Sequence, residues 1–389
     1  MVDAKGKNFN CKNCSGDTID IGKGTPGPNT GKTKTYTGDD KHIVVVNAGP
    51  NTTVNGNRNT VTGGNGNNRR VGTHGNHNTV TLGNGNHNKI TTGPGNGNKA
   101  RVGNGNHNRA VTGPGNHNTA RTGNGTHNRA TTGAGNHNRA SVGNGSHNRA
   151  TAGVGSHNRA TVGSGDHNQA VTGAGSHNRA SVGNGSHNRA IAGVGSHNRA
   201  TVGSGDHNQA VTGAGSHNRA SVGNGSHNRA IAGVGSHNTA NVGNGDHNQV
   251  VTGAGNDNVA LAGRGSHNQV TAGMGSHNTA LAASGSHNRV TTGAGNDNLA
   301  IAGRGDHNQV TAGGPGNHNT ALAGNGDHNR VVVGEGNHNL AGAGAGRGNF
   351  TRTGPGNHNQ TFTGPGQGSR TQVGSGHGNT ANQHPVGPG

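Results

Sequence analysis

Histidine is the residue type with the most evident chemistry in this 389-residue chain, because 25 of its 29 copies occur in His-Asn pairs. The pairs recur every ten residues, as at His127, His137 and His147. Imidazoles in a regular file can bind Zn²⁺, Cu²⁺ or Ni²⁺, and they change charge between pH 5 and 8. The spacing therefore raises two chemical hypotheses, metal binding and a pH-dependent association.

The residues that replace His at this position favour a conformational role instead. The replacements share with His a tolerance of the left-handed backbone: Asn67, Gly97, Asp257 and Asp297. Such a set matches a requirement on φ and does not match a set of metal ligands. We therefore predict a conformational position, assign no metal and no cofactor to it, and keep pH sensing as an alternative.

Arginine follows many of these His-Asn pairs and gives the chain a basic character, with a formal net charge of +18. In every second ten-residue repeat, or decad, we expect Arg on one face, at Arg139, Arg159, Arg179, Arg199 and Arg219. A basic stripe attracts polyanions such as nucleic acid or anionic polysaccharide. Only 1% of the residues are aromatic, which argues against the stacking of bases. The alternative is that these charges keep exposed strands from pairing laterally.

Other candidate chemistry is weak. Cys11 and Cys14 form a single Cys-x-x-Cys, which is at most half a zinc site, and we interpret them as a local disulfide or free thiols in a tail. No combination of Ser, His and an acid stands out from the repeat, and a site built by one decad would be built by all. We therefore expect no enzymatic activity.

The repeat that positions these residues has a period of ten from Gly83 to Ala312: Gly, any residue, Gly, then Asn, Ser or Asp, usually His, and Asn. A second period is superimposed, because residues 141–180 and 181–220 are identical except that Thr151 becomes Ile191. Alternate decads therefore differ. The fold class predicted is all-β, a two-sided β-solenoid with about 20 residues, or two decads, in each coil.

Within a decad, the glycines predict a turn and the following residues a strand. Alternation along the strand places Asn158, Ala160 and Val162 inward and the intervening His, Arg and Thr outward. Inward asparagines of stacked coils are expected to bond to their counterparts above and below. The two ladders predicted are Asn128, Asn148, Asn168, Asn188 and Asn208, and Asn138, Asn158, Asn178, Asn198 and Asn218.

Composition sets the limits of this architecture, since only 24% of residues are hydrophobic and 81 are Gly. Such a chain has no conventional core, which disfavours most enzyme scaffolds. No apolar run approaches the roughly 20 residues of a membrane span, so we expect no membrane insertion. No apolar segment of a secretory signal is visible at the N-terminus.

The expected organisation has five parts. Residues 1–42 are a flexible tail with the Cys-x-x-Cys, and residues 43–82 hold a cap, with a first strand at His42 to Asn47, and degenerate repeats. Residues 83–312 are the regular solenoid. One extra residue near Gly314 and Pro315 shifts the register of the degenerate repeats 313–363, and residues 364–389 are a flexible Gly/Pro-rich tail.

The repeat resembles the curlin repeats of bacterial curli fibres, which read Gln-x-Gly-x-x-Asn-x-Ala-x-Val-x. The resemblance lies at the Gly, Asn and Ala positions of GNGSHNRA, from Gly143 to Ala150, and of GSGDHNQA, from Gly163 to Ala170. Two features depart from curlin: Gly replaces the inward Gln, and the period is ten instead of about eleven. The resemblance implies a secreted, amyloid-like subunit that stacks end to end in an extracellular matrix.

A weaker resemblance is to the calcium-binding RTX nonapeptide, at GAGNDNVA (Gly253 to Ala260) and GAGNDNLA (Gly293 to Ala300). The two Asp residues stand almost alone at a position that is otherwise His, which argues against a regular calcium roll.

Two functions of different classes follow. The first is a fibre-forming structural protein at the cell surface or outside the cell, which associates with itself end to end and serves in adhesion or a biofilm. The second is a monomeric basic rod that binds polyanions such as DNA, anionic polysaccharide or cell wall. Fibre growth distinguishes the first, and binding that weakens steeply with salt distinguishes the second.

Overall fold

The structure is a computed structural model that divides into unit 1, residues 1–196, and unit 2, residues 197–389. It describes unit 2 over 197–383, and unit 1 over 52–54, 60–62, 71–73, 79–82, 88–92, 99–102, 105–112, 117–132, 135, 137–152, 154, 157–172, 174–175, 177–192 and 194–195. The N-terminal tail with Cys11 and Cys14 and the expected cap at His42 to Asn47 lie outside the described residues.

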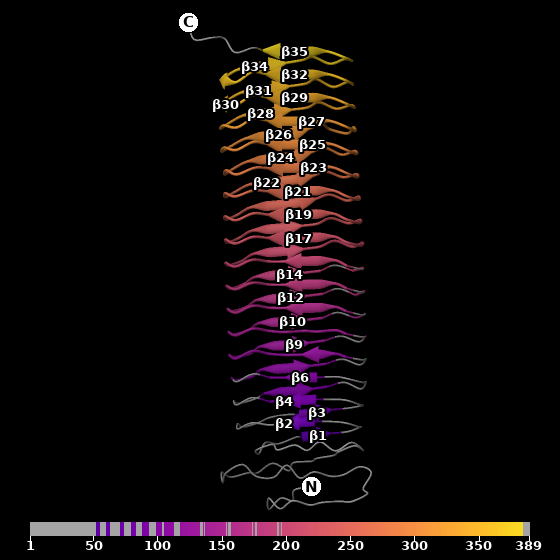
Figure 1. Cartoon of the computed structure of the whole chain (residues 1–389), viewed down its shortest axis with the longest axis vertical. Coiled ribbons are helices and arrows are strands. Elements are labelled where there is room, and N and C mark those ends of the chain that lie inside the picture. The colour runs from indigo at the N-terminus through magenta and orange to yellow at the C-terminus, as the bar shows by residue number, and fades with distance from the viewer. Residues whose placement is uncertain are drawn as a thin grey trace, which may run out of the picture. The chain divides into compact units, whose positions relative to one another are not determined.

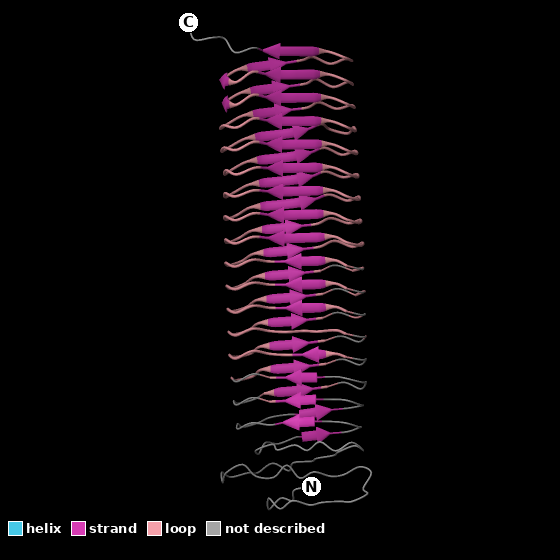
Figure 2. Ribbon diagram, viewed as in Figure 1, coloured by secondary structure: helices cyan, strands magenta, loops and turns pink. Residues whose placement is uncertain are grey.

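The described residues form short parallel strands joined by turns, and they contain no helix (Figures 1 and 2). Strands two decads apart pair in register: Arg149 lies opposite Gln169 in one sheet, and Arg159 lies opposite Arg179 in the other. Each coil therefore contains about 20 residues and contributes one strand to each of two sheets. The all-β, two-sided solenoid predicted from the sequence is confirmed.

Unit 1 contains fourteen described strands. They are β1 (Thr52–Val54), β2 (Thr60–Thr62), β3 (Val71–Thr73), β4 (Thr79–Thr81), β5 (Lys89–Thr91), β6 (Lys99–Arg101), β7 (Arg109–Val111), β8 (Thr119–Ala120), β9 (Arg129–Thr131), β10 (Arg149–Thr151), β11 (Arg159–Thr161), β12 (Gln169–Val171), β13 (Arg179–Ser181) and β14 (Arg189–Ile191). One sheet runs β5-β7-β9-β10-β12-β14, and its opposite is built from β2-β4-β6-β8 and β11-β13. Parallel bridges from Thr119 to Arg139 and from Arg139 to Arg159 connect the last two groups.

Unit 2 contains twenty-one described strands. They are β15 (Arg199–Thr201), β16 (Gln209–Val211), β17 (Arg219–Val222), β18 (Arg229–Ile231), β19 (Thr239–Val242), β20 (Gln249–Thr252), β21 (Val259–Ala262), β22 (Gln269–Ala272), β23 (Thr279–Ala282), β24 (Arg289–Thr292), β25 (Leu299–Ala302), β26 (Gln309–Ala312), β27 (Thr320–Ala323), β28 (Arg330–Val332), β29 (Leu340–Ala343), β30 (Gly346–Arg347), β31 (Phe350–Arg352), β32 (Gln360–Thr363), β33 (Gly366–Gln367), β34 (Arg370–Gln372) and β35 (Thr380–Gln383).

Two parallel sheets make up most of unit 2. Sheet C of unit 2 runs β15-β17-β19-β21-β23-β25-β27-β29-β32-β35, and sheet D of unit 2 runs β16-β18-β20-β22-β24-β26-β28-β31-β34. The short strands β30 and β33 pair with each other in the turns. Consecutive strands thus alternate between the sheets, which is why odd and even decads differ in sequence.

Alternate side chains enter the space between the sheets, as the period of two in the strands predicts. Asn158, Ala160 and Val162 are at most 4% exposed, whereas His157 and Arg159 of the same coil are exposed. The interior is a narrow layer of Asn, Ala, Val and Thr. Burial of side chains this small contributes only about 1 to 2 kcal/mol each, so backbone ladders and polar contacts must supply much of the cohesion.

The turns need glycine because consecutive coils approach each other closely at the glycine positions. Gly265 has φ +128°, and a Cβ built on it would lie 2.0 Å from the backbone oxygen of Gly285 in the next coil. No side chain fits at that distance, and the φ is one that L-residues rarely adopt. The glycine repeat is therefore a requirement of coil stacking and not only of chain reversal.

The one-residue insertion near Pro315 is absorbed inside a turn. Leu299 of β25 still pairs with Thr320 of β27, twenty-one residues later, and the strand register on each side is unchanged. Gly313 takes a φ of +72°, which accommodates the added residue. The insertion therefore shifts the numbering of the repeat without interrupting the solenoid.

The expectation that 364–389 form a flexible tail is wrong for residues 364–383, which complete further coils with β33, β34 and β35. What reads as a Gly-rich tail is a repeat in which Gly378, with φ +69°, stands at the His position. Thr371 and Val373 still point inward and are at most 8% exposed. Glycine fits this position better than any other residue, because the position requires the left-handed backbone.

Candidate functional site

The inward asparagines form two files, which we call file A and file B. File A precedes the strands of the sheet that contains β9, β10, β12 and β14 and of sheet D of unit 2, and file B precedes the strands of the opposite sheet. All ten residues singled out from the sequence are fully buried: Asn128, Asn148, Asn168, Asn188 and Asn208 in file A, and Asn138, Asn158, Asn178, Asn198 and Asn218 in file B.

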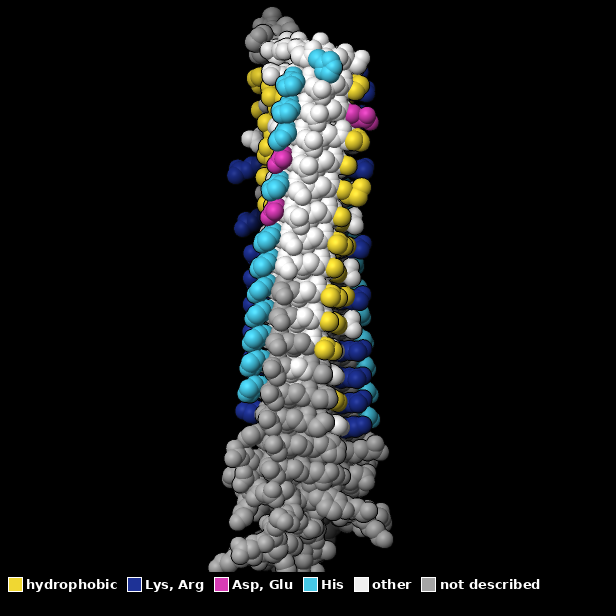
Figure 3. All heavy atoms as spheres, turned by 90° about the vertical axis from the view of Figure 1, so that its right-hand side faces the viewer, with side chains coloured by type: hydrophobic (Ala, Val, Ile, Leu, Met, Phe, Trp, Pro, Cys, Tyr) yellow, Lys and Arg dark blue, Asp and Glu magenta, His cyan; other side chains and the backbone are white. Residues whose placement is uncertain are grey.

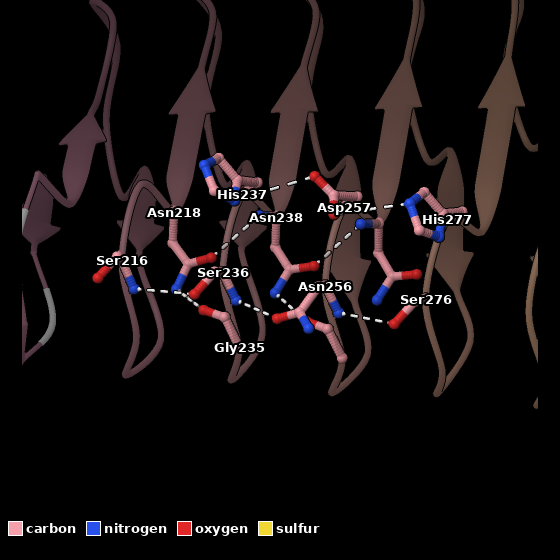
Figure 4. A network of polar contacts seen from close by, with 12 residues as sticks. Ser216, Asn218, Gly235, Ser236, His237, Asn238, Asn256, Asp257, Ser276 and His277 are labelled. Atoms are coloured by element: carbon pink, nitrogen blue, oxygen red, sulfur yellow. Dashed lines mark hydrogen bonds and ion pairs between the residues drawn. The ribbon is translucent and has the colours of Figure 1, made fainter.

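Most inward carboxamides of unit 2 hold the backbone of the following coil by two hydrogen bonds, an arrangement we call the forward clamp (Figure 4). The backbone N–H of Asn238 donates to Oδ1 of Asn218 at 3.0 Å. Nδ2 of Asn218 donates to the carbonyl oxygen of Gly235 at 2.5 Å. The same pair of bonds recurs one coil later, where Asn238 holds Asn258 and Gly255.

The forward clamp differs from the ladder predicted from the sequence. The prediction had each side chain bond to the next side chain, whereas the structure pairs each side chain with backbone groups. The reason is that the Asn N–H and the Gly carbonyl of the turn face the buried interior, where each needs a partner. A carboxamide carries one acceptor and one donor group and satisfies both.

Polar residues one position before His form a second ladder that runs in the opposite direction. The N–H of Ser236 donates to Oδ1 of Asn256 at 2.7 Å, and the N–H of Asn256 donates to Oγ of Ser276 at 3.3 Å (Figure 4). These side chains therefore reach back to the preceding coil. Sequence reasoning missed this ladder, although the prevalence of Asn, Ser and Asp at the position is the signal of an acceptor there.

The two ladders give the solenoid a direction along its axis. Buried carboxamides bind the coil that follows, and exposed turn side chains accept bonds from the coil that precedes. The two faces of any one coil are therefore chemically different and complementary. This arrangement favours head-to-tail stacking and disfavours the pairing of two like faces.

The His position has the left-handed backbone that its substitution pattern predicts. His157 has φ 62°, Asp257 and Asp297 have φ 56° and 57°, and Gly348 has φ 70°. The conformational interpretation of this position is confirmed. The imidazoles also stack in files: the ring centroids of His137 and His157 are 4.5 Å apart. In Figure 3 one such file runs along the surface of each unit.

Two carboxylates interrupt one of the two His files in unit 2, whereas the other file is stacked without interruption from His227 to His328. Oδ1 of Asp257 lies 3.9 Å from Nδ1 of His237, and Oδ2 lies 3.7 Å from Nε2 of His277. Oδ2 of Asp297 lies 4.0 Å from Nε2 of His318. All of these side chains are about half exposed, so each ion pair that forms on protonation of His contributes little on its own.

The arginines singled out from the sequence lie on the outer face of one sheet in each unit. In unit 1, Arg159 pairs with Arg179 in register, and a bridge joins Arg139 to Arg159. In unit 2, Arg199 lies opposite Arg219. Burial, followed by the charges of Arg121 and Arg159, lowers the pKa of Arg139 from its ordinary value.

The opposite sheet of unit 1 carries a similar column, because Arg109 and Arg149 both lie beside Arg129 in register. Burial and then the charges of these two neighbours lower the pKa of Arg129. Sequence reasoning did not single out this column. Its signal is the repetition of Arg in consecutive odd decads before Gln169.

Neither a metal cluster nor a membrane-spanning helix is found in the part of the chain that the structure describes. No three His, Cys, Asp or Glu side chains there are placed to hold a metal ion. No helix there is long and apolar enough to cross a bilayer.

Known proteins give no further guide. No protein-family model matches the chain, and no curated protein matches it.

Proposed function

We propose that this chain is a structural protein whose copies add end to end, coil on coil, into fibres at the cell surface or outside the cell. The curlin resemblance of the repeat and the solenoid fold support this assignment. The forward clamp carries it, because the clamped coils of unit 2 offer their carboxamides to backbone groups that a further coil of the same kind supplies. We expect no catalytic activity of such an assembly.

The C-terminal end of unit 2 offers a template for addition. Strands β34 and β35 lie at the ends of their sheets, and within the described residues no strand pairs with their outer edges. Asn379 is the last residue of file B, and its exposure is higher than that of the buried Asn359. Unpaired strand edges of this kind recruit further strands.

The direction of the backbone donors at this end can be read from the preceding coils. The N–H of Phe350 donates to the carbonyl of Ser369, and the N–H of Gln360 donates to the carbonyl of Asn379, both toward the following coil. The equivalent donors in the last coil are the N–H groups of Arg370 and Thr380. Proline at these two positions removes the donors without breaking a bond to the preceding coil.

The experiment compares fibre growth of the wild-type chain with that of Arg370→Pro/Thr380→Pro, with Arg370→Val/Thr380→Val as the control that keeps both donors. Electron microscopy and X-ray fibre diffraction are the measurements. Wild type and control should form fibres with a reflection near 4.7 to 4.8 Å, and the proline variant should form at least tenfold fewer. Wild-type protein that stays monodisperse at high concentration would refute the proposal.

Polyanion binding is a second candidate function, which the in-register Arg columns of unit 1 favour. Like charges one strand apart repel, and a polyanion relieves that repulsion. We expect Arg139→Gln/Arg159→Gln/Arg179→Gln to reduce the affinity for heparin, and the salt dependence of binding to become shallower. Affinity that does not change with salt concentration would exclude this function.

A further inference from the structure

The outer face of sheet C of unit 2 is largely apolar from β21 to β32, whereas its earlier strands β15 and β17 carry Arg199 and Arg219 there. We call the stretch from β21 to β32 the apolar face, and its side chains are Val259, Leu261, Leu281, Leu299, Ile301, Leu322, Leu340 and Phe362. Each of them is partly exposed. On sheet D of unit 2 the first outward residue of β20, β22, β24 and β26 is polar instead, namely Gln249, Gln269, Arg289 and Gln309.

The apolar face is regular because its strands are in register. Leu261 lies opposite Leu281, Leu281 opposite Ile301, and Ile301 opposite Leu322. At the next strand Gly342 leaves a gap, and the Phe362 ring lies over it, so that a Cβ on Gly342 would be 2.9 Å from Cδ1 of Phe362. The result is an apolar strip that continues over consecutive coils.

Opposite charges line the two long edges of this strip. Asp257 lies directly before β21, and Arg264 lies in the turn after it; Asp297 and Arg304 take the same places around β25. All four side chains are exposed. Figure 3 shows the acidic side chains as interruptions of the His file, next to a column of apolar side chains. The coil with Asp257 and Arg264 is thus followed, two coils or forty residues later, by the coil with Asp297 and Arg304.

We infer that the apolar face binds the apolar face of a second copy of this chain, with the two solenoid axes parallel. A two-fold axis parallel to the solenoid axis relates the two facing surfaces. It brings the Asp edge of one copy against the Arg edge of the other, and each coil stays at the same height along the axis. Asp257 of one copy then meets Arg264 of the other, and Asp297 meets Arg304. The charge pattern is thus complementary to itself in this one orientation, which favours a second copy of the chain over other partners.

The size of the strip indicates when this contact forms. Six coils at about 4.8 Å, with side chains covering about 10 Å across, give on the order of 300 Å². A stable dimer needs about 800 Å² from each partner. A single strip is therefore too small for an isolated dimer, whereas a fibre presents one strip for each subunit and binds with avidity. The inference rests on the proposed end-to-end assembly and assigns lateral bundling of fibres to this surface.

The first test replaces the centre of the strip, with Leu281→Lys/Ile301→Lys. The matched control is Thr271→Lys/Thr291→Lys, which adds the same charge to the outward positions of β22 and β24 in sheet D of unit 2. Fibre mass per length, measured by scanning transmission electron microscopy, reports the number of laterally associated chains. We expect the test variant to fall to half the wild-type value or less, and the control to match wild type.

The second test reverses the charge at one edge, with Arg264→Asp/Arg304→Asp, and the control is Arg289→Asp/Arg352→Asp on sheet D of unit 2. These turn positions accept Asn, Ser, Val and Met elsewhere in the chain, so the variant should fold. Alone it should form single fibres, because Asp faces Asp. Mixing it with Asp257→Asn/Asp297→Asn should restore paired fibres, since Arg of one chain then meets Asp of the other.

The outcomes separate the two proposals. Absence of fibres in the wild-type chain refutes end-to-end assembly itself. Fibres of unchanged mass per length in both test variants, with assembly intact, refute the lateral contact alone. Equal loss of bundling in the test and control variants also refutes it, because general charge would then govern association.

Discussion

Unit 1 and unit 2 share the same ten-residue repeat but differ in the contacts that the repeated residues make. In the file-B coils of unit 1, Nδ2 of Asn158 donates to the carbonyl of Val154 in its own turn, at 3.0 Å. In unit 2, Nδ2 of Asn258 donates to the carbonyl of Gly275 in the next coil, at 2.6 Å. The same residue at the same place therefore closes a turn in one unit and joins two coils in the other.

The buried and the exposed side chains of the two units also differ. From Val250 to Val331, sheet D of unit 2 places Val where the corresponding sheet of unit 1 has Ala, for example at Ala150 and Ala170. Outside, unit 1 presents columns of Arg, and unit 2 presents the apolar face. The comparison teaches that cohesion between coils increases in unit 2, while repulsion between neighbouring charges is concentrated in unit 1.

The largest expected effect is on the clamps. Asn258→Ala removes the acceptor for the N–H of Asn278 and the donor to Gly275, and leaves both groups buried without a partner. At about 1 to 3 kcal/mol for each group, we expect a local loss of about 4 kcal/mol. Asn158→Ala removes the donor to the Val154 carbonyl of its own turn, which should cost about 1 to 3 kcal/mol. Hydrogen exchange of peptides from the mutated coils measures both, and equal losses would remove the distinction between the units.

Valine in the core should give the second largest effect. Val270→Ala removes two buried carbons from a side chain that is 1% exposed, which should cost about 2 kcal/mol in the coils around it. The reverse change in unit 1, Ala170→Val, tests whether the narrower layer has room. We expect it to destabilise, because added volume in a closely packed layer forces the sheets apart. A gain in protection against exchange would show instead that unit 1 is underpacked.

Acidification should affect unit 1 more than the interrupted part of the His file in unit 2. His137, His157 and His177 are stacked without interruption at 4.5 Å. Protonated neighbours at this distance repel one another before salt screening, so protonation of the file should lower stability there. Around Asp257 and Asp297 each added charge gains an anionic neighbour instead.

Hydrogen exchange at neutral and at acidic pH, corrected for the intrinsic rate, should show this contrast. Asp257→His/Asp297→His restores the uninterrupted file and should make unit 2 as sensitive to acid as unit 1. Raising the salt concentration should reduce the difference, because the groups are exposed. Equal acid sensitivity of the variant and the wild-type chain would show that the imidazoles do not set the stability of the files.

The sequence predicted the fold because each structural requirement repeats in it. Gly at the close approach, the left-handed residue and the inward Asn recur in every decad, and the forty-residue period fixes two decads per coil. The partners of Asn218 could not be predicted, because the pattern shows that the residue faces inward but not which backbone groups face it. The apolar face was also missed, since Leu261 and Ile301 are single changes in a frame otherwise read for its regularity.

The smallest expected effect separates the two roles of His. Asn tolerates the left-handed backbone as well as His does, so His157→Asn, at φ 62°, should change local stability by less than about 0.5 kcal/mol at pH 7.5. His157→Val places a β-branched residue in the same conformation and should cost about 1 to 3 kcal/mol. His217 of unit 2, at φ 59°, should respond in the same way. If Asn were as damaging as Val in either unit, ring stacking and not backbone conformation would explain why His is used there, and the pH dependence of that unit would then follow from its packing as well as from its charge.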